Sequence, residues 1–187
     1  MKKNIRVGEN EHLILPLFWD GQEKEISYQI NLAERGAQLV LWGLLLGKNE
    51  DGLELRINIY HSAPETKSKV VLKGVLTGSS KINFEGLVKI EKGSKGANAW
   101  LGSHFLLLSE KAKGRAIPSL EILENDIKAG HAATVGKVND LELFYLMSRG
   151  LTKDQAKKII VEGFLKSILE KLPENITHHS KSLKEYS

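Results

Sequence analysis

Apolar and polar residues alternate along most of the first two thirds of the chain. In residues 53–59 every second residue is apolar, and residues 82–90 repeat the pattern with one glycine in the apolar set. A period of two is typical of β-strands that bury one face. We expect strands over residues 13–18, 24–32, 38–46, 53–61, 67–76, 81–90, 99–109 and 117–123.

Glycine, asparagine, aspartate and serine separate these segments, as expected of tight turns. Dipeptides typical of a two-residue hairpin, such as Asp51-Gly52, are rare between these segments. Many strands are therefore expected to pair with strands that do not adjoin them in sequence. Periodicity alone predicts a mainly β fold and leaves a sandwich, a barrel and a solenoid open.

The period changes after Asn139. One helical face collects Leu141, Phe144, Tyr145 and Ser148. Gly150 then favours a helix end, and Thr152 with Gln155 forms a capping box that opens a second helix, expected to end before Pro173. We expect a β core over 1–136, a two-helix region over 137–173 and an irregular polar tail over 174–187.

The chain of 187 residues contains no cysteine. Disulfides, thiolate catalysis and metal sites built from this chain's own thiolates are therefore excluded. The net charge is +4, and the lysines are dispersed among acidic residues. This pattern does not favour nucleic-acid binding.

The sequence has no membrane-spanning pattern. No apolar run approaches the ~18 residues that a membrane helix needs. The basic N-terminus leads into Arg6, Glu9 and Glu11, where a signal peptide would carry its apolar stretch. We expect a cytoplasmic protein.

Several motifs, taken in chain order, resemble the SufB/SufD family of iron–sulfur cluster assembly proteins. They are HSAPETKS at 61–68, IPSLEI at 117–122, NDIKAGHAATVG at 125–136 and LFYLMSRGL at 143–151. The resemblance covers about residues 60–172, and the SufD side is the closer match.

The resemblance implies a right-handed parallel β-helix core with a C-terminal two-helix region. It implies a scaffold subunit with no active site of its own, which pairs through its β-helix with a SufB-like subunit or with a second copy. The C-terminal helices would dock a SufC-type ABC ATPase. The chain has no glycine-rich phosphate loop with which to bind ATP itself.

The chain departs from the full-length family pattern. It lacks the long N-terminal helical domain and has room for fewer β-helix turns. Ser103 stands where SufB-like members carry a functional cysteine, and serine is no substitute for a thiolate as a soft ligand. Any iron or cluster would therefore be shared with a partner. The alternative is an orphan homodimeric β-helical binding protein without cluster chemistry.

Four residues are candidate ligands for a metal. His131 matches the SufD-like histidine at the subunit interface, where a neutral imidazole can ligate iron. Glu121 and Asp126 are candidate oxygen ligands, or groups that orient the imidazole. His104 is a weaker nitrogen candidate. A packed histidine and solvated carboxylates explain the same residues equally well.

The two expected helices supply the candidate docking surface for the ATPase. The predicted contacts are Phe144, Tyr145, Arg149, Lys153 and Phe164. The alternative is that their apolar members pack onto the end of the β-helix. A carbohydrate-active β-helix enzyme would need converging carboxylates, and we find no such pair in the sequence. The adjacent His178 and His179 support no function beyond adventitious metal binding.

Overall fold

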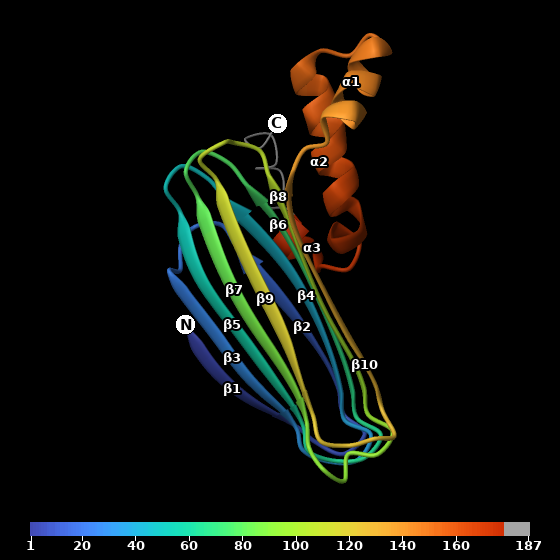
Figure 1. Ribbon diagram of the computed structural model, residues 1–187. Helices are drawn as coiled ribbons and strands as arrows, with labels where there is room; N and C mark the ends of the chain where they lie inside the picture. The colour runs from blue at the N-terminus through green and yellow to red at the C-terminus, as the bar shows by residue number, and fades with distance from the viewer. Residues whose placement is uncertain (178–187) are drawn as a thin grey trace.

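The chain winds between two parallel five-stranded sheets. The computed structural model describes residues 1–177 and forms a β-solenoid of about 5 turns (Figure 1). Sheet A has the order β1 (Lys2–Val7), β3 (Glu25–Leu32), β5 (Gly52–His61), β7 (Lys81–Ile90) and β9 (Lys113–Ile122). Sheet B has the order β2 (His12–Trp19), β4 (Gln38–Gly47), β6 (Lys67–Leu76), β8 (Asn98–Leu107) and β10 (Lys128–Lys137).

Aligned apolar columns fill the space between the sheets. On sheet B the register places Leu41 beside Val70 and Val70 beside Leu101, and all three side chains are fully buried. On sheet A, Ile30, Ile59 and Val88 are aligned and buried in the same way. Because alternate residues point inward, the predicted period of two produces this core directly.

A buried histidine stands at one corner of the solenoid. The ring nitrogens of His61, at the end of β5, lie 2.8 Å from Thr66 Oγ1 and 2.8 Å from Ser68 Oγ. Ser94 Oγ donates to the His61 carbonyl oxygen from the next coil. Burial lowers the pKa of His61 to about 4, so the ring is neutral at neutral pH. These contacts give His61 a structural role at the corner of a coil.

Up to residue 177, the solenoid is followed by three helices: α1 (Asp140–Ser148), α2 (Lys153–Leu169) and α3 (Glu174–Thr177). Helix α2 packs on the outward side of sheet B. Its Val161, Leu165 and Ile168 form a second apolar cluster with Leu44 and Val75. Figure 1 shows the helices beside the upper part of sheet B, near the ends of its strands. No helix within residues 1–177 is long and apolar enough to cross a membrane.

The predicted strands agree with the structure apart from the two ends of the solenoid. The strand prediction missed β1, which is rich in charge, and β10, which is rich in small residues, and it began β9 late. The expectation of an irregular tail is wrong at its start, because α3 begins at Glu174. Residues 178–187, including His178 and His179, lie outside the described part.

Candidate functional site

The two main helices are fixed by their caps. Asn139 Oδ1 accepts the Leu141 N–H at the start of α1. At α2, Thr152 Oγ1 accepts the Gln155 N–H, and Gln155 Oε1 accepts the Thr152 N–H, so the predicted capping box is confirmed. Both helices are thus held at defined starting points.

Helix α1 turns its apolar side chains to solvent. Leu141, Phe144 and Tyr145 are 78%, 69% and 58% exposed, and no residue of α1 is buried. The Arg149 guanidinium lies 5.3 Å from the centre of the Tyr145 ring and donates to its hydroxyl at 3.2 Å. Such a group of apolar side chains, with a cation at its border, is typical of a protein-binding surface.

The five predicted docking residues differ in their exposure to solvent. Phe144, Tyr145, Arg149 and Lys153 are exposed. Phe164 is only partly exposed, because it packs against the apolar cluster beneath α2 and lies under the Lys73 ammonium, 4.7 Å from its ring centre. Its aromatic ring therefore helps to seat α2 on sheet B, as the packing alternative anticipated.

His131 ends an inward-facing column of sheet B. It lies beside Leu101 in the register of β10 and β8, at the position that Leu41, Val70 and Leu101 fill with apolar side chains. Within residues 1–177 no further coil follows β10, so His131 is exposed at the open end of the solenoid. An imidazole there is available to a partner that stacks on this end.

The other candidate ligands point elsewhere. Glu121 lies on the outer face of sheet A, 2.9 Å from Lys89 Nζ, and this hydrogen bond raises the pKa of Lys89. Asp126 follows β9 and lies 3.7 Å from Lys95 Nζ. Within residues 1–177 no three His, Asp or Glu side chains gather as a metal site.

His104 lies on the opposite face of β8 from the buried Ser103. Its Nδ1 is 2.9 Å from Thr134 Oγ1, and burial together with the Lys73 charge lowers its pKa. Ser103 Oγ is fully buried and has no hydrogen-bond partner among the described residues. Ser103 is thus enclosed in the core of this chain.

The last coil leaves two strand edges open. Among the described residues, β9 and β10 each pair on one side only, with β7 and β8 respectively. Their outer backbone N–H and C=O groups are available for further strand pairing. Pro118 has no backbone N–H, so it interrupts the row of hydrogen-bond donors along β9. On β10, the neighbours of His131 are the small residues Ala132 and Ala133.

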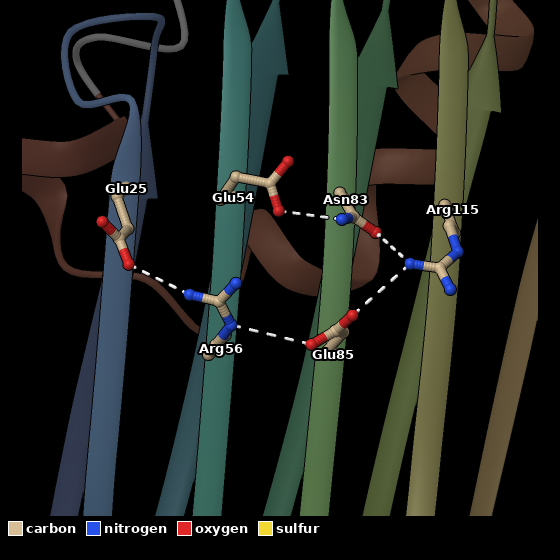
Figure 2. Close-up of polar contacts among 6 residues, drawn as sticks. All are labelled: Glu25, Glu54, Arg56, Asn83, Glu85 and Arg115. Atoms are coloured by element: carbon tan, nitrogen blue, oxygen red, sulfur yellow. Dashed lines mark hydrogen bonds and ion pairs between the residues drawn. The ribbon is translucent and has the colours of Figure 1, made fainter.

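A polar network crosses four coils on the outer face of sheet A. Figure 2 shows Arg56 between Glu25, at 3.0 Å, and Glu85, at 3.6 Å. Arg115 continues the network to Glu85 at 3.4 Å. This network was not predicted from the sequence, although its charged residues recur there at about the spacing of one coil, as Glu25, Glu54 and Glu85 do. The network pairs Arg56 and Arg115 with Glu25 and Glu85.

Comparison with known proteins agrees with the architecture. The sequence model of the SUF system FeS cluster assembly SufBD core domain matches residues 16–164. The iron-sulfur cluster assembly protein SufD of Bacillus subtilis is 40% identical over 130 residues, which are 70% of this chain and 30% of that protein. SufB of the same organism is 31% identical over 142 residues, or 76% of this chain and 30% of SufB.

A SufBD family protein of Mycobacterium leprae is 32% identical over 160 residues, 81% of this chain and 41% of that protein. The chain thus spans less than half the length of these relatives, and within them its identity to SufD exceeds its identity to SufB. With the parallel solenoid and the two C-terminal helices in place, the chain belongs to the SufB/SufD family of iron–sulfur cluster assembly proteins, on the SufD side.

Proposed function

We propose that this chain is a SufD-like scaffold subunit in iron–sulfur cluster assembly, which acts through a SufC-type ATPase. Its task is to hold partners in position, with no turnover of its own. Iron or a cluster is cargo shared with a partner, because the chain supplies no thiolate. The setting we propose is the cytoplasm.

The exposed apolar side of α1 carries this proposal. Leu141, Phe144 and Tyr145 have no cover within the described chain, while α2 is anchored on sheet B through Leu165 and Ile168, which are 0% and 1% exposed. A firmly seated helix pair that presents uncovered aromatic side chains suits a docking role. The family membership makes an ATPase the proposed occupant.

The open end of the solenoid supports the second proposed contact. Strand edges β9 and β10 offer backbone pairing to a SufB-like subunit or to a second copy of this chain. His131 would then lie within the contact, where its imidazole is a nitrogen ligand for shared iron. Glu121, Asp126 and His104 lie on other faces of the solenoid. We therefore do not propose them as direct ligands beside His131.

The test is direct binding of the purified chain to the SufC-type ATPase of the same source, measured by titration calorimetry with and without ATP. We expect the Phe144→Asp/Tyr145→Asp variant to weaken binding at least tenfold, because it places charge in a desolvated contact. The Arg149→Glu/Lys153→Glu variant should weaken it as well. Leu123→Asp, a matched change at an apolar residue that is 52% exposed outside the helices, should bind like wild type.

Absence of ATPase binding under every nucleotide condition would overturn the proposal. In that case the orphan homodimeric binding protein becomes the preferred function, since the candidate metal ligands of one chain lie apart. Analytical ultracentrifugation separates the two outcomes: the orphan protein forms a dimer that no ATPase joins.

A further inference from the structure

The outward side of sheet B has a half that α2 leaves uncovered. We call it the tryptophan face and define it by Ile14, Val40, Lys67, Lys69 and Trp100. Trp42 lies at its border, where it packs against the apolar cluster beneath α2. In Figure 1 this face corresponds to the lower part of sheet B, away from the helices. None of its residues belongs to the docking surface on α1.

Strand register aligns this face into a row. Ile14 pairs with Val40, Val40 with Lys69, and Lys69 with Trp100. Ile14 is 58% exposed and Trp100 41% exposed. An open depression of about 480 Å³ runs along Val40, Lys67, Lys69 and Trp100. A row of exposed apolar side chains across neighbouring strands is a candidate interface.

Glycines allow the Trp100 ring to lie against the sheet. A Cβ built on Gly130 would stand 3.0 Å from the ring, and one built on Gly102 would stand 3.1 Å from its Nε1. The indole therefore rests over the backbones of β8 and β10. It provides a flat apolar surface at the end of the row.

The charge of this face is uncompensated. The five strands of sheet B contain no aspartate or glutamate. Lys67 and Lys69 form no ion pair with any residue in the range 1–177, and Lys69 Nζ lies 5.3 Å from the Trp42 ring centre. An occupant with carboxylates beside an apolar stripe would complement both features.

The packing of α2 shows that the outward side of sheet B can bind a helix. Helix α2 lies over β4 and β6 of sheet B and buries Val161, Leu165 and Ile168 against Leu44 and Val75. Val40 precedes Leu44 by four residues on β4, about 13 Å along a strand. This separation accommodates a second helix beside α2, since helices are about 10 Å wide.

We propose that the tryptophan face binds an acidic amphipathic helix from a partner chain. The row from Ile14 to Trp100 crosses three strand spacings, about 14 Å, which matches roughly ten helical residues. Apolar side chains of that helix would cover Ile14, Val40 and Trp100, and its acidic residues would face Lys67 and Lys69. This interaction goes beyond the proposed ATPase docking and shares no residue with it.

The probe is a fluorescein-labelled helical peptide with a leucine stripe and glutamates on its other positions, titrated by fluorescence anisotropy. A counterpart peptide carries lysines in place of the glutamates. We expect saturable binding of the acidic peptide and at least tenfold weaker binding of the lysine peptide. The Lys67→Glu/Lys69→Glu and Trp100→Ser variants should each weaken the acidic peptide at least fivefold. Lys81→Glu/Lys113→Glu, a matched reversal of two exposed lysines on sheet A, should have no effect.

Four results would overturn the proposal. One is equal binding of both peptides, and another is undiminished binding to the Lys67→Glu/Lys69→Glu variant when circular dichroism shows that it is folded. The third is preferential binding of a labelled oligothymidine, and the fourth is self-association that Trp100→Ser abolishes, since either would assign the face to another occupant. Because no ATPase is present in the assay, these outcomes are independent of the test of the proposed function.

Discussion

Sheet A turns a face of paired charges to solvent, whereas the outward side of sheet B carries apolar side chains and lysines. On sheet A, Arg56 lies between Glu25 and Glu85, and Arg115 extends the pairing to the next coil. On sheet B, α2 covers Leu44, Leu46 and Val75, and no strand carries an acid. The inner sides of both sheets are equally apolar.

The difference teaches which side of a solenoid is available for binding. Packing between the sheets fixes the inward residues, so the outward residues are free to differ. Charges that are paired with one another, such as Arg56 with Glu25 and Glu85, have little to gain from a partner, because these ions are already paired and hydrated. An apolar face with unpaired lysines is stabilised when another element buries it. Helix α2 does this on one half of sheet B.

The largest expected effect concerns the covered half of sheet B. Leu165→Ala leaves a cavity at a fully buried position beneath α2 and should lower the free energy of unfolding by about 2–5 kcal/mol. Urea denaturation measures the change. Ile159→Ala, at a 45% exposed position of the same helix, is the control and should change stability by less than about 0.5 kcal/mol. A similar loss of stability in both variants would contradict the packing of α2 on sheet B through Leu165.

The next effect tests the corner where the two sheets join. The pKa of buried His61 is about 4, below its ordinary value of 6.5, so the unfolded chain takes up a proton before the folded chain does. Stability should therefore fall as pH falls through this window, by roughly 3 kcal/mol between pH 7 and pH 4. Urea denaturation at several pH values measures this, and His61→Gln should remove most of the dependence.

Charge reversals should separate the outer faces directly. Arg56→Glu places a third carboxylate between Glu25 and Glu85, and we expect a loss of about 1 kcal/mol that shrinks in high salt. Lys69→Glu enters a sheet without acids and should change stability by less than about 0.5 kcal/mol. Thermal denaturation at low and high salt measures both. Equal losses on the two faces would contradict the proposed difference in compensation.

The smallest effect concerns the shared interior. Ser103→Ala removes a buried hydroxyl that has no partner among the described residues, and we expect a gain of up to about 1 kcal/mol. Ser68→Ala is the matched control, because Ser68 Oγ is buried and bonded to His61. The control should lose about 1 kcal/mol in urea denaturation. A loss in Ser103→Ala would reveal a partner for its hydroxyl.

Local sequence pattern predicted most of the strands and both main helices. Strands β6 and β7 have the bounds that alternation predicted, because each buries every second residue through its whole length. Strand β10 was missed, since its inward positions include Ala129, His131 and Ala133 in place of large apolar residues. The last coil has no neighbour to bury it, so the usual alternation is absent.

The candidate site was predicted only in part. The exposed positions of Phe144, Tyr145 and Arg149 agree with the docking hypothesis. The packing role of Phe164 became visible only from its contacts with the apolar cluster between α2 and sheet B. Sequence order brought His131, Glu121 and Asp126 close together, but the chain turns between the sheets at Asp126. That turn sends the three side chains to different faces.

The sequence by itself determined the inward and outward sides of each strand, the caps of the helices, the absence of thiolate chemistry and the family, because each depends on local residue order or on residue identity. The tertiary structure decided which outward residues meet across coils. Arg56 reaches Glu25 and Glu85, and Lys69 aligns with Trp100, only because parallel pairing stacks successive coils in register. A partner recognises the surface that this stacking assembles, which no single segment of the chain contains.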